Sequence, residues 1–339
     1  MTTIIDDSLK YNTLGTYDVI VLGGGITGLA IARTLAMKGL HIALIEPTGI
    51  LGREITRARN MFVHLEEYVD DSITIQVFYE CLLKAKGWFN GVIDPNAAAL
   101  AFDEMLNQCK VQVLFHTWPS HLLHDDLKVN GLVVATNNGY ALMKTEQVID
   151  ASFYGKLGRS WFYSKPSVWH VSVLNLTFNG VEGTCPYESK LIMPDLGDVK
   201  VLCRPTHWKN EWLVSLILER KFERAEWIVL LADLLPILQQ EIHELRSGVL
   251  AYVADDVYNT PHIRISTKSK DDRIIGYLDK SKGKSVGIYQ RMLCDKTTIQ
   301  GLTLAGNWID GISFDPRIEE ASIINSFKLG DLIGTSFLK

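Results

Sequence analysis

Residues 17–46 read Y-D-V-I-V-L-G-G-G-I-T-G-L-A-I-A-R-T-L-A-M-K-G-L-H-I-A-L-I-E, and this stretch decides the fold. Its apolar run, residues 19–22, is short enough for a buried strand. Three glycines follow, Gly23, Gly25 and Gly28. The first permits a tight turn, the second lets a pyrophosphate approach the backbone, and the third lets helix and strand pack closely. The helix that we expect to open at the second glycine would point free N–H groups at the phosphates.

The second half of the stretch contains an acid at the position where dinucleotide-binding folds bind a ribose. Gly39 predicts the end of the helix. A second strand, residues 42–45, then leads to Glu46, about 20 residues past the glycines, where an acid accepts hydrogen bonds from a ribose diol. Strand, glycines, helix and acid all agree, so the stretch predicts a dinucleotide site without distinguishing FAD from NAD.

Composition limits the partners of the chain. Its 339 residues, 47% of them hydrophobic, can form one large domain or two smaller ones. A net charge of -5 without a basic block argues against a nucleic-acid partner. We see no secretory signal and no membrane span, and the five cysteines form no C-x-x-C pair, so we expect a cytoplasmic protein with reduced thiols.

The pattern beyond the opening stretch departs from a simple alternation of strand and helix. Residues 94–108 predict a helix, with Asp as N-cap and Pro at the first helical position. Strands are expected at 111–115 and 148–150, and a strand pair over 120–140. Short antiparallel strands would therefore separate two parts of the main sheet. The histidines between 116 and 124 lack metal-ligand spacing, so we predict no metal site.

The middle of the chain has a different texture. Strand-like segments alternate there with tryptophans, and a long amphipathic helix is expected between Glu223 and Arg246, bent or broken near Pro236. We interpret residues 161–294 as an inserted, sheet-rich substrate domain. Residues 1–160 and 295–339 would then form one dinucleotide-binding domain.

The C-terminal part returns to the dinucleotide-fold pattern. Residues 301–307 predict a buried strand that ends in a glycine turn at Gly306 and Asn307. A last helix is expected from near Arg317 to about Leu332, and its N-terminus would again offer unpaired N–H groups to an electron-rich group.

Four blocks carry a family resemblance. They are D-V-I-V-L-G-G-G-I-T-G-L-A (18–30) with its acid, G-I-L-G-R-E-I-T (49–56), I-D-P-N-A-A-A-L-A-F-D-E-M-L through V-I-D-A-S-F-Y-G (93–155), and L-T-L-A-G-N-W-I-D-G (302–311). Together they resemble FAD-dependent oxidoreductases of the glutathione-reductase-2 fold. The resemblance implies an α/β fold: a Rossmann-like FAD-binding domain with a β-meander crossover and an inserted α+β substrate domain.

The resemblance also implies FAD as the cofactor and a role for each matched position. The chain departs from the family pattern where Arg53 replaces a glycine, Ser152-Phe153 replaces Thr-Gly, and Asn307 replaces an acid. The implied contacts are Gly23, Gly25, Ile26, Thr27 and Gly28 at the pyrophosphate, Glu46 at the adenosine ribose, Arg53 and Thr56 near the pyrophosphate or isoalloxazine, Ala151 and Ser152 along the ADP portion, Gly306 and Asn307 at the ribityl chain, and Arg317 and Ile318 at the pyrimidine edge.

Three functions stay open at this point. The first is an FAD-dependent oxidoreductase that moves hydride between flavin and a small-molecule or carrier-bound substrate. The second is a flavin-dependent monooxygenase using NAD(P)H and oxygen, and the third is a non-catalytic dinucleotide-binding subunit. No catalytic base can be named; His170, His207 and Tyr163 are candidates only because they lie in the substrate domain. A homo-oligomer or a partner protein is left open.

Overall fold

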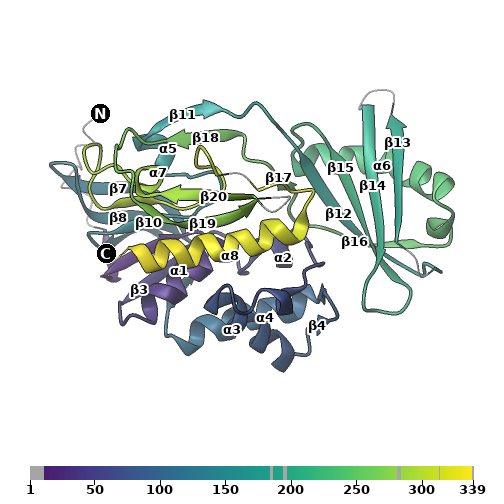
Figure 1. The fold of residues 1–339 in the computed structure, drawn as a ribbon, viewed down its shortest axis with the longest axis horizontal. Helices are drawn as coiled ribbons and strands as arrows, with labels where there is room; N and C mark the ends of the chain where they lie inside the picture. The colour runs from purple at the N-terminus through teal and green to yellow at the C-terminus, as the bar shows by residue number, and fades with distance from the viewer. Residues whose placement is uncertain (1–10, 184–185, 194–196, 281–283, 313, 338–339) are drawn as a thin grey trace.

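The computed structural model describes residues 11–183, 186–193, 197–280, 284–312 and 314–337. Figure 1 shows two lobes, one built from both ends of the chain and the other from a segment between them, residues 172–259. Each lobe has its own large group of buried apolar side chains.

A parallel sheet lies at the centre of the first lobe. Both ends of the chain contribute to it. The strand nearest the C-terminus, β21, and the N-terminal strand β2 pair in parallel with opposite edges of β10. The strands of this sheet are almost fully buried, as a parallel sheet covered on both faces requires. In spatial order they are β21 (Leu302–Leu304), β10 (Val148–Asp150), β2 (Val19–Leu22), β3 (Ile42–Glu46) and β6 (Gln112–Phe115). The strands predicted in these places are confirmed.

Helices cover this sheet. The first, α1 (Ile26–Ala36), lies alongside the last, α8 (Glu319–Ser336), as Figure 1 shows. Their contact is close because Gly330 faces Ala30, and a Cβ on that glycine would come within 2.6 Å of the carbonyl oxygen of Thr27. The pair α3 (Ile73–Lys84) and α4 (Pro95–Gln108) packs nearby.

The capping prediction for α4 is confirmed. The Asp94 carboxylate accepts hydrogen bonds from the N–H groups of Asn96 and Ala97, both at 2.9 Å. The last helix differs slightly from its prediction: it begins at Glu319 rather than near Arg317 and continues to Ser336.

A β-meander joins β6 to β10. The predicted pair of strands is a set of three, β7 (Trp118–Asp125), β8 (Lys128–Thr136) and β9 (Gly139–Lys144), with antiparallel pairing. An N-terminal strand, β1 (Asn12–Thr16), adds to β9 in parallel. This crossover replaces the helix that a simple alternating domain would have at this point.

The second lobe is an antiparallel sheet with a helix on one face. The helix α6 (Arg224–Glu241) buries Trp227 and Leu234 against the sheet, and a short 3-10 turn, η2 (His243–Leu245), follows it. Of the bend or break predicted near Pro236, the break is wrong, because the helix continues through this residue to its end. The strands are β12 (Ser172–Asn179), β13 (Tyr187–Met193), β14 (Gly197–Pro205), β15 (Glu211–Leu218), β16 (Val249–Val253) and β17 (Tyr258–Asn259).

The remaining elements lie outside the two large sheets. Leu278, Ile288 and Leu293 lie inside the predicted substrate domain yet belong to the buried core of the first lobe. We therefore propose that the second lobe ends near residue 260 rather than 294. These remaining elements are α2 (Arg53–Thr56), η1 (Leu65–Glu67), β4 (Trp88–Phe89), β5 (Val92–Ile93), α5 (Gly158–Trp161), β11 (Tyr163–Pro166), β18 (Ile263–Ser266), β19 (Ile274–Lys280), β20 (Lys284–Tyr289) and α7 (Gln290–Leu293).

Candidate FAD site

The turn between β2 and α1 has no room for side chains. Gly23 has φ +97°, and a Cβ there would lie 2.6 Å from the carbonyl oxygen of Ala151. A Cβ on Gly28 would overlap the carbonyl oxygen of Gly23 itself. Only glycine therefore permits the turn to lie against the end of β10 and the helix to lie against the turn.

A cavity of about 260 Å³ opens over this turn. Segments nearly 300 positions apart in the sequence meet at it, because β21 brings the C-terminal part of the chain next to β10. The structure brings nine of the predicted site residues together in its wall: Gly23, Gly25, Thr27, Glu46, Arg53, Ala151, Ser152, Gly306 and Asn307.

The other five predicted residues do not line the cavity. Ile26 and Gly28 lie beneath the turn in the packed core of α1. The Thr56 hydroxyl donates to the carbonyl oxygens of the preceding loop. Arg317 pairs with Asp315 and Glu219 at the surface, and Ile318 is 41% exposed before the first turn of α8.

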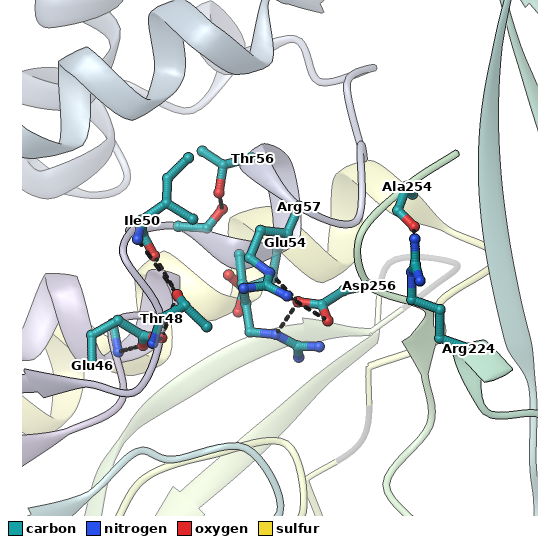
Figure 2. Close-up of polar contacts among 12 residues, drawn as sticks. Glu46, Thr48, Ile50, Glu54, Thr56, Arg57, Arg224, Ala254 and Asp256 are labelled. Atoms are coloured by element: carbon teal, nitrogen blue, oxygen red, sulfur yellow. Dashed lines mark hydrogen bonds and ion pairs between the residues drawn. The ribbon is translucent and has the colours of Figure 1, made fainter. Parts of the chain in front are cut away.

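Glu46 is held rigidly at one end of the cavity. Its Oε2 accepts a hydrogen bond from Gly24 N at 2.7 Å, and its Oε1 accepts from the N–H and hydroxyl of Thr48 at 2.8 and 2.7 Å (Figure 2). These three donors orient a buried carboxylate and occupy both acceptor positions of Oε1 and one of Oε2. One acceptor position on Oε2 is left for a hydroxyl group, so the contact of Glu46 with a ribose stays a prediction.

Two arginines and an aspartate meet at the middle of the cavity. Asp256, from the loop after β16, pairs with Arg57 at 2.8 Å and with Arg53 at 3.3 Å (Figure 2). The Arg53 guanidinium also lies 3.7 Å from the centre of the Phe153 ring. The sequence analysis named Arg53 but missed Asp256, because no local pattern indicates a contact across two hundred residues.

The closing segment is fixed by two polar contacts. The Trp308 indole N–H donates to the carbonyl oxygen of Ser152 at 3.0 Å. The Arg264 guanidinium donates to the carbonyl oxygens of Asn307 at 2.6 Å and Ile312 at 2.7 Å. Arg264 thereby holds the loop after β21 against the cavity.

A buried aspartate supports the floor of the site. Asp150, at the end of β10, accepts hydrogen bonds from the N–H and hydroxyl of Ser152 and from the N–H groups of Leu157 and Gly158. Burial raises the pKa of Asp150, and these four donors act in the opposite direction. The carboxylate thus fixes the chain that runs from β10 under the cavity.

The comparison with protein families now decides the assignment. Residues 18–160, from β2 to α5, match the family model described as FAD dependent oxidoreductase. The match covers less than half of the chain, and over these residues the chain is similar to FAD-dependent oxidoreductases. The cofactor of this oxidoreductase is FAD, and the side-chain-free turn at Gly23 and the buried acid Glu46 fit its diphosphate and ribose. Among curated proteins, none matches the sequence.

Solved structures share the fold of this oxidoreductase. A geranylgeranyl bacteriochlorophyll reductase-like protein from Thermoplasma acidophilum has a TM-score of 0.64 at 16% identity, covering 95% of this chain and 77% of that one. A flavoprotein/dehydrogenase from Cytophaga hutchinsonii has a TM-score of 0.59 at 15% identity, covering 95% and 78%. The anhydrotetracycline hydroxylase OxyS from Streptomyces rimosus has a TM-score of 0.55 at 12% identity, covering 87% and 56%.

The candidate bases from the sequence lie away from the cavity of this oxidoreductase. His207 stacks on Phe89 at 3.9 Å, and burial lowers its pKa. His170 lies near His262, and Tyr163 is exposed on β11. None of the three lines the cavity.

Two negative findings apply to the described part of the chain. No helix in it combines the length and apolar character that a bilayer crossing needs. No group of three or more His, Cys, Asp or Glu side chains in it could hold a metal ion.

Proposed function

We propose that this oxidoreductase oxidises or reduces a C–N, C–O or C–C bond of a small-molecule or carrier-bound substrate by hydride transfer to or from the flavin. When bound, FAD supplies the redox chemistry, and the protein orients the substrate and tunes the electronics of the ring. The observation that carries the proposal is the composition of the cavity wall. Asp256, Tyr258 and Asn259 of the second lobe face the glycine turn of the first.

Asn259 is the polar group best placed to orient a substrate or the flavin edge. The residue is 4% exposed, and its amide nitrogen donates to the carbonyl oxygen of Phe222 at 3.2 Å. Its amide oxygen is buried and makes no hydrogen bond of ordinary geometry among the residues that the structure describes, while the Asn259 side chain lies close enough to the Tyr154 hydroxyl to lower the pKa of Tyr154. A buried acceptor left unpaired costs free energy, so an N–H or O–H donor brought into the cavity gains by pairing with it.

The flavin spectrum under anaerobic conditions tests this proposal. Protein with bound FAD is mixed without oxygen with candidate amines, alcohols and NAD(P)H. We expect at least one donor to bleach the visible absorption of the oxidised flavin. We expect Asn259→Leu to slow bleaching by the substrate more than it weakens FAD binding. A flavin that no donor reduces, while dithionite does reduce it, would contradict the proposal.

A flavin-dependent monooxygenase is the second candidate. The fold shared with the hydroxylase OxyS supports it, and so does the loose similarity of residues 148–159 to a strand-end motif of aromatic hydroxylases. Substrate-stimulated, NAD(P)H-dependent oxygen consumption would favour this reaction. Reduction of the flavin by substrate alone would favour the first.

A further inference from the structure

A carboxylate lies on the N-terminus of α1. Glu54, in α2, accepts a hydrogen bond from the N–H of Ile26 at 3.1 Å through its Oε2. A Cβ on Gly25 would lie 2.8 Å from its Oε1. The N-cap residue of α1 is Gly25, which has no side chain to satisfy this donor, and the first turn of the helix contains no acid of its own. Glu54 therefore acts as the cap from a distance of 28 residues.

This position is the one that a diphosphate requires. After a glycine turn of this kind, the pyrophosphate of a dinucleotide binds at the N-terminus of the helix and accepts from its free N–H groups. The Glu54 carboxylate is an acceptor for the same Ile26 N–H. Its side chain lines the cavity, whose volume of about 260 Å³ is below the ~300–1,000 Å³ of typical small-molecule sites.

The charges around Glu54 do not favour an additional anion. The charged and titratable groups that line the cavity with it are Arg53 from its own helix, Arg57 directly after that helix, Glu46 from β3, Asp256 from the loop after β16, and Tyr258 from β17. Asp256 pairs with both arginines, so their charge is already partly balanced (Figure 2).

The protonation of Glu54 responds to these surroundings. Burial raises the pKa of Glu54. Arg53 and the backbone N–H groups of Glu54 and Ile26 act in the opposite direction, and the Glu46 carboxylate raises the pKa again by a smaller amount. A diphosphate placed beside it would act in the same direction as Glu46, because a nearby like charge disfavours ionisation.

We propose that Glu54 occupies the diphosphate position of the FAD-free protein, and that FAD binds to the form in which this carboxyl is protonated. An ionised carboxylate only accepts hydrogen bonds, whereas a protonated carboxyl has one O–H to donate to a phosphate oxygen. FAD binding then takes up one proton, and its affinity falls as the pH rises. The inference concerns cofactor binding and is independent of which substrate is oxidised.

Titration of the FAD-free protein with FAD tests the inference. Flavin fluorescence gives the Kd from roughly pH 5.5 to 8.5, where the Kd of the wild type should rise by up to about tenfold per pH unit because one proton is linked to binding. Glu54→Gln keeps the size of the side chain and removes its charge. We expect this variant to bind FAD at least about tenfold more tightly than wild type at the upper end of the range, with little pH dependence.

A matched control and a second measurement keep the outcome clear. Glu80→Gln removes the same charge from an exposed position on α3 and should reproduce the wild-type Kd at every pH. Calorimetry of the wild type in two buffers of different ionisation enthalpy counts the protons taken up, even if the Glu54 variant does not fold. Net uptake of a proton near pH 7.5 is the expected result.

Two results would overturn the inference. The first is a wild-type Kd and a Glu54→Gln Kd with the same pH dependence, and the second is binding without proton uptake. Failure of both proteins to bind FAD at every pH would also overturn it, but that result would contradict the cofactor assignment as well. If FAD binding takes up a proton as expected but no donor reduces the bound flavin, the inference stands. That result would contradict only the proposed reaction.

Discussion

The indole N–H of Trp308 donates a buried hydrogen bond to the carbonyl oxygen of Ser152, 156 residues earlier in the chain. The ring lies between two glycines: a Cβ on Gly155 would come within 2.8 Å of it, and a Cβ on Gly306 would overlap the indole nitrogen. Gly306, which the family resemblance places at the ribityl chain, must therefore also be a glycine to leave room for the Trp308 ring. The contact joins the last strand of the parallel sheet to the loop that follows its neighbour.

Trp308→Phe removes this hydrogen bond and keeps an aromatic ring. We expect the free energy of unfolding to fall by about 1–3 kcal/mol, because a buried carbonyl loses a partner and the smaller ring leaves space. Urea unfolding followed by circular dichroism measures the change. A variant as stable as the wild type would show that the two segments are held by other contacts.

Gly28→Ala tests the close packing of α1 on the glycine turn. The added Cβ meets the carbonyl oxygen of Gly23, so we expect destabilisation by about 1–3 kcal/mol or more and loss of FAD binding. Gly39→Ala is the matched control at the other end of the helix. It meets no atom within 4 Å, but φ is +86°, so it should cost about 1 kcal/mol and leave the FAD affinity unchanged. Equal effects of the two variants on FAD binding would contradict the account.

Glu46→Gln tests the ribose end of the cavity. The amide keeps one acceptor and presents an N–H₂ group to one of the backbone donors, Gly24 or Thr48, that the carboxylate now satisfies. We expect FAD affinity to fall by about 10- to 100-fold, which corresponds to about 1.4–2.7 kcal/mol. Fluorescence titration at a fixed pH gives the value. An affinity within twofold of the wild type would show that this acid does not contact the cofactor.

The stability of the FAD-free protein should depend on pH through Glu54. Its pKa in the folded protein is raised above the ordinary value of 4.5 by burial, so the folded state holds this proton more tightly than the unfolded state. The stability contributed is fully present below the unfolded pKa and is lost as the pH rises through the folded pKa. Glu54→Gln should therefore be more stable than wild type near pH 8, and the difference should shrink towards pH 5. Urea unfolding at both pH values measures the difference in the free energy of unfolding between the two proteins. A difference that is constant with pH would contradict a raised pKa of Glu54 in the folded protein.

Local chemistry made much of the first lobe predictable. Asp94 caps α4 as its position before a proline predicts, and α1 ends at Ala36, three residues before Gly39, whose φ is +86°. In each case the signal lies within a few residues of the feature, so no knowledge of the fold is needed to read it.

Tertiary packing decided what the sequence could not show. α6 continues through Pro236, because burial of its apolar side against the sheet outweighs one missing hydrogen bond. The hairpin of β19 and β20 packs beside α8 in the first lobe rather than in the second. Glu54 reads as an ordinary helix residue in sequence, and its place on the N-terminus of α1 comes only from the fold.

The most direct measurement of the central claim is the visible absorption spectrum of the purified protein after incubation with FAD and removal of the free cofactor. The account predicts flavin bands in the wild type at about one FAD per chain, and none in Gly28→Ala at the same pH. A wild-type protein that retains no flavin at any pH, or a Gly28→Ala variant that retains as much as the wild type, would contradict it.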